Sequence, residues 1–168
     1  HPLLVSKPIK PLRVTTDAGR LTPQALDILK MACDYPLVIS TGHADAREVR
    51  ALVDESVRLG VARLMLNQPA NPLTDLKAAE LLEIATAPNV FIEQTALTYL
   101  LGYQQEDDFR EVLSTVPNVV YSSDLSQTSQ MDVNDWLEQS QRWFDTFELD
   151  NARRVQVTLA NPQKMLEL

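Results

Sequence analysis

The stretch LVISTGHADAREVRALVDESVRLGVARLMLNQP, residues 37–69, holds one complete unit of strand, helix and strand. Both ends are short, nearly continuous apolar runs, which are typical of strands buried on both faces. The helix between them is expected to start after Asp45 and to stop at Gly60. Its buried face is expected to consist of Val49, Leu52, Val53 and Val57. A strand that returns to its sheet through a helix runs parallel to the first strand, so this stretch predicts a parallel α/β fold.

The same alternation continues on either side of this stretch. The expected strands are residues 12–16, 37–40, 62–66, 90–93 and 119–122. Helix start signals lie between them, at Thr22 with Pro23, at Asp45, and at Thr74 with Asp75. We therefore expect about five parallel strands joined by right-handed helical crossovers.

Residues 133–168 are expected to form C-terminal helices, and residues 1–11 an irregular segment. One face of the first of these helices is spaced to pack, with residues Trp136, Ser140, Trp143, Phe144 and Phe147. Asp150 and Asn161, which precedes a proline, can each cap a short terminal helix. A length of 168 residues fits a single domain over residues 1–168.

Composition excludes several classes of function. The formal charge is −8, and the 15 basic residues are scattered, so neither nucleic acid nor a membrane surface is an expected partner. No apolar run is long enough to cross a bilayer, and no signal peptide is recognisable, which predicts a cytoplasmic protein. The sequence contains no G-x-G-x-x-G, P-loop or G-x-S-x-G motif. The single cysteine, Cys33, shares a helical stripe with Ala25, Ile28, Leu29 and Ala32 and is expected to pack in the interior.

Polar residues follow four of the expected strands. They include His43 after the second strand, Asn67 after the third, Glu93 at the end of the fourth and Asp124 after the fifth. Chemistry in parallel α/β folds gathers at the carboxyl ends of strands, so these side chains are expected to surround one site.

Each of these residues also has a structural interpretation. His43 could cap the next helix or bond to a carbonyl, and Asp124 could cap a neighbouring helix. Glu93 could form a salt bridge with an arginine, because a carboxylate at the end of an apolar strand is costly to bury without a partner. Asn67 could simply form a turn before Gln68 and Pro69.

A succession of short motifs resembles a known family. In order they are TGH at 41–43, IEQ at 92–94, YSSDLSQ at 121–127 and ANPQKMLEL at 160–168. Together they are similar to the uncharacterised amidohydrolase-related family of metal-dependent hydrolases, within the amidohydrolase superfamily of TIM barrels. The resemblance runs from about Val14 to the C-terminus. It implies parallel (β/α) units of a TIM-barrel-like fold.

The resemblance also implies a mechanism and a set of site residues. A divalent metal, most often zinc and otherwise manganese or iron, would activate water for attack on a C–N or C–O bond of a small-molecule substrate. His43 would be a metal ligand, and Asp124 would be both a ligand and the base that moves the water proton. Asn67, Glu93 and Gln127 would line the substrate pocket.

The sequence departs from the family in ways that bear on activity. Asn67 stands where related sequences carry a histidine, and no His-x-His pair is present, so His43 and Asp124 supply two of the three ligands that a catalytic zinc needs. Five strands also make a partial barrel, because a complete one takes about 250 residues. A homo-oligomer or an N-terminal portion would then cover the sheet edges, or the five strands would form a self-contained open sheet.

Three functions remain open on this sequence. The chain is part of a metal-dependent hydrolase that is possibly inactive in isolation, or a degenerate relative that binds a small molecule or a protein, or an unrelated α/β binding module.

Overall fold

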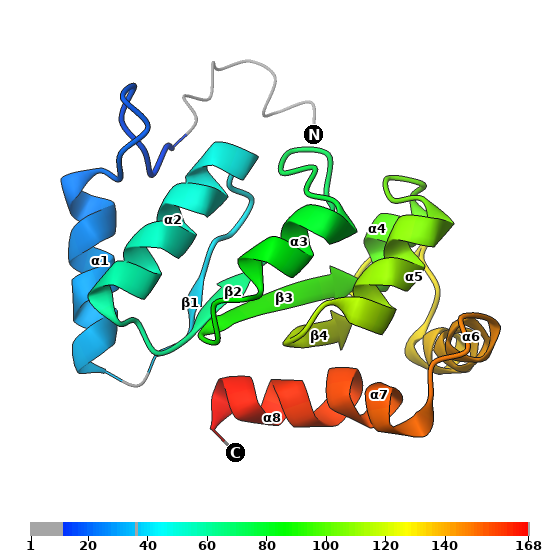
Figure 1. Ribbon diagram of the computed structural model, residues 1–168. Helices are drawn as coiled ribbons and strands as arrows, with labels where there is room; N and C mark the ends of the chain where they lie inside the picture. The colour runs from blue at the N-terminus through cyan, green and yellow to red at the C-terminus, as the bar shows by residue number, and fades with distance from the viewer. Residues whose placement is uncertain (1–11, 36, 168) are drawn as a thin grey trace, which may run out of the picture.

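The computed structural model describes residues 12–35 and 37–167, and its centre is a sheet of four parallel strands (Figure 1). The strands follow the order β1-β2-β3-β4, so sheet neighbours are also sequence neighbours. Their bounds are Ile39–Ser40, Leu64–Leu66, Val90–Thr95 and Val119–Ser122. The pairing of Ile92 with Val119 and of Leu64 with Val90 sets the register.

Five helices precede or connect the strands, and a helical tail follows β4. The first group is α1 Pro23–Asp34, α2 Ala46–Leu59, α3 Ala78–Ile84, α4 Ala96–Leu100 and α5 Glu106–Thr115. The tail is α6 Val133–Thr146, α7 Asn151–Val155, the π-helical segment η1 Gln156–Ala160 and α8 Asn161–Leu166.

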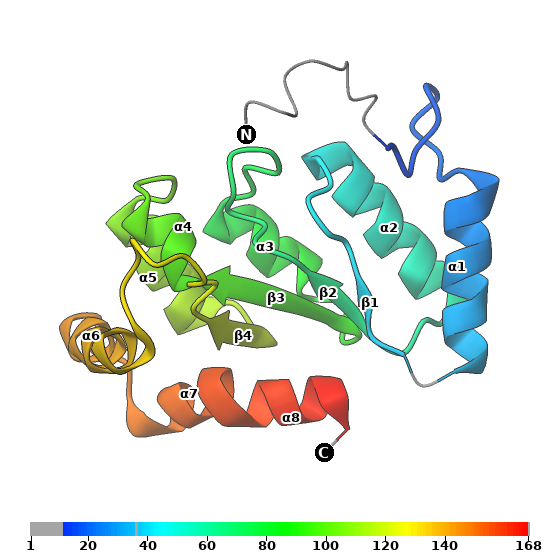
Figure 2. The ribbon, with the colours of Figure 1, turned by 180° about the vertical axis from the view of Figure 1, so that it is seen from behind.

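The two faces of the sheet have different partners. Helices α2, α3 and α5 all pack on one face, here named the outer face, in one cluster with Leu64, Leu66, Ile92 and Val119. The opposite, inner face carries Met65, Phe91 and Val120, against which Met165 of α8 packs (Figure 2). In a doubly wound sheet helices cover both faces, whereas crossovers on one face with sequential strand order are typical of a barrel. The fold is therefore α/β, with parallel units of TIM-barrel type.

Helix α2 confirms the capping expected from the sequence. The side chain of Asp45 accepts hydrogen bonds from the backbone N–H groups of Arg47 and Glu48. In return, the side chain of Glu48 accepts from the backbone N–H of Asp45, which completes a capping box. Gly60 ends the helix in the left-handed conformation at φ 76°, which a glycine adopts at no steric cost. Val49, Leu52 and Val53 are buried as expected, but Val57 is 51% exposed.

The expected strand at residues 12–16 is wrong. Thr15 pairs only with Leu21, in an isolated antiparallel bridge closed by a turn with Gly19 at φ 74°. Val14 and Thr15 then donate hydrogen bonds to the buried carboxylate of Glu48. This segment finds its partners locally and on α2, so the described sheet has four strands and not five.

Three further expectations need correction. Cys33 is exposed, because it lies at the border of the α1–α2 contact, with its sulfur 3.4 Å from the carbonyl oxygen of Leu59. Thr74 does not start α3: its hydroxyl donates to the carbonyl oxygen of Ala44, and the helix begins at Ala78. Asn161 does not cap a separate helix, because η1 runs into α8 and the buried Asn161 amide donates to the carbonyl oxygen of Val119.

The helical tail returns to the amino ends of the strands. Asp150 caps α7 as expected, and Ser140, Trp143, Phe144 and Phe147 of the α6 region are buried. At the end of α8, Glu167 forms a salt bridge of 2.7 Å with Arg63, whose side chain is 5% exposed. The irregular segment expected over residues 1–11 lies outside the described part of the chain.

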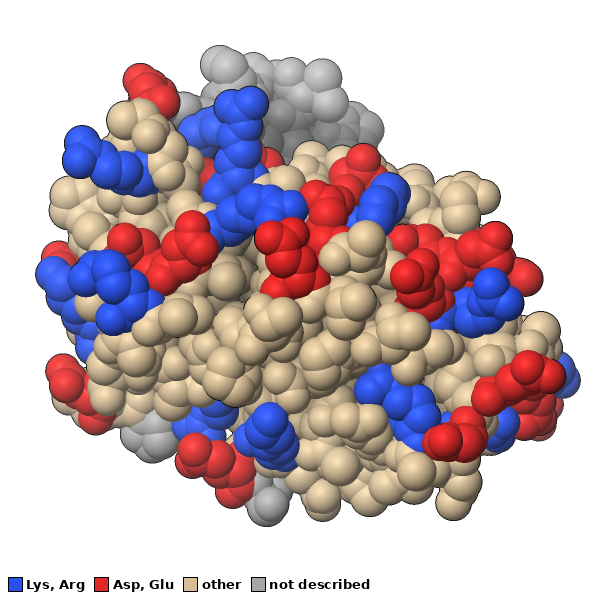
Figure 3. Space-filling view, viewed as in Figure 1, with Lys and Arg blue, Asp and Glu red and all other residues tan. Residues whose placement is uncertain are grey.

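Charged side chains are dispersed over the surface. On the face shown in Figure 3, Lys and Arg lie among Asp and Glu and form no continuous basic area. No helix in the described part of the chain is long and apolar enough to cross a membrane.

Candidate functional site

Four strand ends lie at one edge of the sheet, because the strands are parallel. Side chains alternate between the faces of a strand, so a residue two positions after an inner-face residue lies on the same face. Glu93 follows Phe91 by two positions, and Ser122 follows Val120 in the same way. These positions place polar side chains on the inner face, just above its apolar floor.

Glu93 is at the centre of this group. Its Oε1 accepts a hydrogen bond of 3.0 Å from the hydroxyl of Ser122. Its Oε2 accepts from the side-chain amide of Asn67 at 3.0 Å and from the backbone N–H of Gln68 at 3.3 Å. The described residues give Glu93 no salt bridge with an arginine, so its partners differ from the expected ones. Three neutral donors from the ends of β2 and β4, the two strands that flank β3, hold this carboxylate in place.

Asn67 joins the end of β2 to the loop after β1. Its Oδ1 accepts from the hydroxyl of Ser40 and, at 3.1 Å, from the backbone N–H of Gly42. Its own backbone N–H donates to the hydroxyl of Thr41. An amide oxygen has two lone pairs, and both are used here. Asn67 is therefore a link within the site, and it does more than form a turn.

Gln68 ties Asp124 to the same group. The side-chain amide of Gln68 donates to Oδ2 of Asp124, while its backbone N–H donates to Glu93. Both Gln68 and Asp124 have left-handed backbone conformations, at φ 41° and φ 54°. Non-glycine residues adopt this conformation at a cost and often do so at functional sites. We name the set of Ser40, Asn67, Gln68, Glu93, Ser122 and Asp124 the strand-end cluster.

Two residues expected at the site are not bonded to this cluster. His43 follows Gly42 and is exposed, and its imidazole forms no hydrogen bond with any described residue. Gln127 lies in the exposed loop before α6, where its backbone N–H donates to the side chain of Gln130. Both remain predictions for the site.

Ser40, Gln68 and Ser122 lie at the same strand ends in the sequence, but no role in the site was predicted for them. Ser40 and Ser122 lie two positions after inner-face residues, so strict two-residue alternation along each strand would have indicated them. Gln68 has no such signal, since it bonds through a left-handed turn that the sequence does not specify. Gln94, by contrast, points to the outer face, where it is buried against Gln104.

The donor set of this edge does not fit a tightly bound zinc ion. Within residues 12–35 and 37–167, no three His, Cys, Asp or Glu side chains come close enough to hold a metal. Both lone pairs of Asn67 Oδ1 and of Glu93 Oε2 accept hydrogen bonds from the protein. A catalytic zinc needs three protein ligands, and the described side chains at this edge supply fewer.

We expect Glu93→Ala to lower the free energy of unfolding by about 2 kcal/mol, because three donors lose a charged acceptor. Glu93→Gln is the matched control and is expected to cost less than about 1 kcal/mol. The glutamine oxygen can still accept from Asn67 and Gln68, and its NH₂ group can donate to the hydroxyl of Ser122. Urea unfolding followed by circular dichroism measures both, and equal losses would contradict this assignment.

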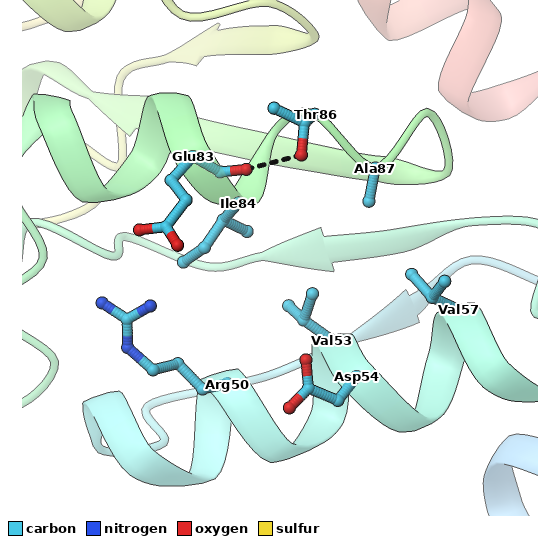
Figure 4. Close-up of a pocket in the computed structure, with 8 residues that line it drawn as sticks. All are labelled: Arg50, Val53, Asp54, Val57, Glu83, Ile84, Thr86 and Ala87. Carbon is cyan, nitrogen blue, oxygen red and sulfur yellow. Dashed lines mark hydrogen bonds between the residues drawn. The ribbon is translucent and has the colours of Figure 1, made fainter.

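A surface groove lies away from this edge of the sheet. A groove of about 430 Å³ separates α2 from α3 on the outer layer of helices (Figure 4). Arg50 and Glu83 lie near its entrance, and Val53 and Ile84 line its floor. Arg50 is already paired with Glu80 at 2.7 Å. The groove contains no member of the strand-end cluster.

The fold is similar to that of a solved amidohydrolase. The structure of an amidohydrolase from Burkholderia multivorans, crystallised with bound zinc, matches with a TM-score of 0.66 at 15% sequence identity. The match covers 99% of this chain and 68% of that chain. At this identity the likeness concerns the fold alone, and it confirms the expected α/β, TIM-barrel-like architecture.

Sequence comparison gives a family but no activity. No curated protein matches the chain significantly. Residues 2–93 match the model of a family of unknown function, DUF6282. Because this match spans more than half of the 168 residues, the protein belongs to the DUF6282 family.

Proposed function

We propose that the chain is the ligand-binding part of an amidohydrolase-like protein, and that the strand-end cluster binds a small polar molecule without hydrolysing it. The observation that carries the proposal is the hydrogen-bond arrangement at Glu93 and Asn67. Their side chains bond to each other and to neighbouring donors, as they would in a preorganised binding surface.

The unused valences of the cluster indicate the class of ligand. Oδ1 of Asp124 accepts no bond from the described residues, and Oε1 of Glu93 has one remaining lone pair. The hydroxyl oxygens of Ser40 and Ser122 can also accept. A cluster rich in acceptors favours a ligand that brings donors, such as an amide, an amine or a polyol.

Binding at this site can be measured on the side-chain amides of the cluster. A panel of small amides, amines and polyols is expected to include members that shift the ¹⁵N–¹H cross-peaks of the Asn67 and Gln68 side chains in a saturable way. Asp124→Asn replaces one free acceptor by a donor and is expected to weaken binding about tenfold. Glu111→Gln, an exposed charge change on α5, is the control. Shifts that do not saturate, or that Asp124→Asn leaves intact, would contradict the proposal.

A second candidate is metal-dependent hydrolysis, with His43 and Asp124 completed by ligands from outside the described residues. It is favoured by the position of both residues after strands that end at one edge, and by the zinc in the similar amidohydrolase. Here His43→Ala and Asp124→Asn are each expected to abolish hydrolysis while leaving the fold intact.

Metal content separates the two candidates. We expect elemental analysis of tag-free protein, purified without chelators, to find far less than one zinc, manganese or iron per chain. His43→Ala is expected to leave that value unchanged. About one metal per chain that disappears in His43→Ala would reject the non-hydrolytic proposal and support the second candidate.

A further inference from the structure

A separate pocket lies between α6, η1 and the outer face of β4. Its volume is about 300 Å³, which is at the lower end of the range for small-molecule sites. It is lined by Tyr121, Trp136, Leu137, Ser140, Gln141, Phe144 and Thr158. Tyr121 points to the outer face and the strand-end cluster belongs to the inner face, so the two sites are on opposite sides of the sheet.

The walls of this pocket are aromatic and fixed. The rings of Tyr121 and Trp136 lie 5.8 Å apart at an interplanar angle of 29°. Tyr121 also meets Phe144 edge to face, at 5.2 Å and 63°. Tyr121, Ser140 and Phe144 are 7%, 4% and 2% exposed, so the floor is buried while Leu137 and Gln141 form an exposed rim. Such walls suit a planar apolar molecule.

The donor and the acceptor of each hydrogen bond in this pocket can be assigned. The hydroxyl of Ser140 donates its single proton to the carbonyl oxygen of Trp136 at 2.7 Å. In the 2.8 Å contact between Tyr121 and Ser140, the tyrosine must therefore be the donor. The indole N–H of Trp136 in turn donates to the Tyr121 oxygen at 3.3 Å. Burial raises the pKa of Tyr121, which keeps the phenol protonated in this role.

This arrangement leaves acceptors in the pocket and no free donor among these groups. The oxygens of Tyr121 and Ser140 each have one unused lone pair, while all three protons are committed. The mouth is bordered by Thr158 in η1, and π-helical segments in proteins are often found at functional sites.

We propose that this pocket is a second binding site, for a small planar aromatic molecule that carries an N–H or O–H donor. The ring lies against Tyr121, Trp136 and Phe144, and the donor bonds to the oxygen of Ser140 or Tyr121. A molecule of the same shape without a donor loses that bond and binds more weakly.

Two probes of equal shape test the role of the donor. Indole carries an N–H, and benzofuran is its isostere with an oxygen in that position. The chain has two tryptophans, so titration of the ¹⁵N-labelled full chain can follow both indole N–H cross-peaks. Indole is expected to shift the Trp136 peak with a Kd of about 1 mM or lower, and at least about fivefold more tightly than benzofuran. The absence of a saturable shift, or equal affinities, would overturn the proposal.

Substitutions test whether the two probes bind in this pocket. Thr158→Phe narrows the mouth and is expected to abolish binding of both probes. The matched control is Thr146→Phe on α6, since both threonines are exposed and donate to the carbonyl oxygen four residues earlier. Ser140→Ala removes one of the two acceptors and is expected to reduce the preference for indole over benzofuran. Thermal unfolding shows whether each variant is folded, and indole binding that survives Thr158→Phe in a folded protein would place the site elsewhere.

Discussion

Replacing Phe109 by alanine is expected to lower the free energy of unfolding by about 4 kcal/mol, the largest loss we predict for a single side chain. Phe109 is fully buried at the centre of an aromatic group on α4, α5 and α6. Its ring stacks on Tyr99 at 4.5 Å and 6°, and meets Trp143 at 5.7 Å and Phe147 at 5.8 Å edge to face. Alanine leaves a cavity that three rigid rings cannot fill.

Guanidinium chloride unfolding followed by far-ultraviolet circular dichroism measures this loss. Phe109→Leu keeps most of the volume and is expected to cost about 1.5 kcal/mol. Tyr103→Ala removes an aromatic side chain that is 49% exposed, and is expected to cost about 0.5 kcal/mol or less. If Phe109→Ala and Tyr103→Ala cost the same, the aromatic group would not be a core.

Replacing Arg153 by alanine is expected to lower the free energy of unfolding by about 3 kcal/mol, because its guanidinium donates to carbonyl groups at the end of α5. Its Nε donates to the carbonyl oxygen of Leu113 at 2.6 Å, and its Nη2 donates to the carbonyl oxygens of Val116 and Val112. The last carbonyl groups of a helix have no partner within the helix. Burial lowers the pKa of Arg153, and the group remains charged at any pH at which the protein is studied.

The same unfolding experiment compares Arg153→Ala with two other variants. Arg153→Lys keeps the charge but not the planar set of donors, and is expected to lose about 2 kcal/mol. Arg142→Ala removes an exposed arginine whose ion pair with Glu138 spans 3.9 Å, and is expected to cost about 0.5 kcal/mol or less. If Arg153→Ala left the free energy of unfolding unchanged, water would satisfy the carbonyl groups at the end of α5 equally well.

Most of the fold could be predicted from residues 37–69 and their repetition. The parallel strands and the caps at Thr22, Asp45 and Gly60 follow from local chemistry, and the structure has them. Residues 12–16 were misinterpreted because an apolar β-branched run does not specify its partner. There Val14 and Thr15 bond to Glu48, a residue more than 30 positions away, and no local pattern encodes such a contact.

The meeting of three polar residues at one edge of the sheet could be predicted from the sequence, but the hydrogen bonds among them could not. Strand ends place Asn67, Glu93 and Asp124 at one edge. Asn67 donates directly to Glu93, and Gln68 joins Glu93 to Asp124. The alternative of an arginine partner for Glu93 is not seen among the described residues, since any donor that reaches a buried carboxylate can satisfy it. The expected burial of Cys33 failed for a related reason. Helical periodicity gives the buried face of α1 but not its width, and Cys33 falls at the edge of that face.

The strand order β1-β2-β3-β4 has a consequence for how the chain acquires its structure. Each strand finds its partner one crossover away, so loop closure during sheet growth stays short and a nascent chain can add units in the order of synthesis. The ion pair between Arg63 and Glu167 is different, because it closes a loop of about 100 residues. We therefore expect docking of α8 to be a late step, before which Phe91 and Val120 are open to water and to association with other unfinished chains.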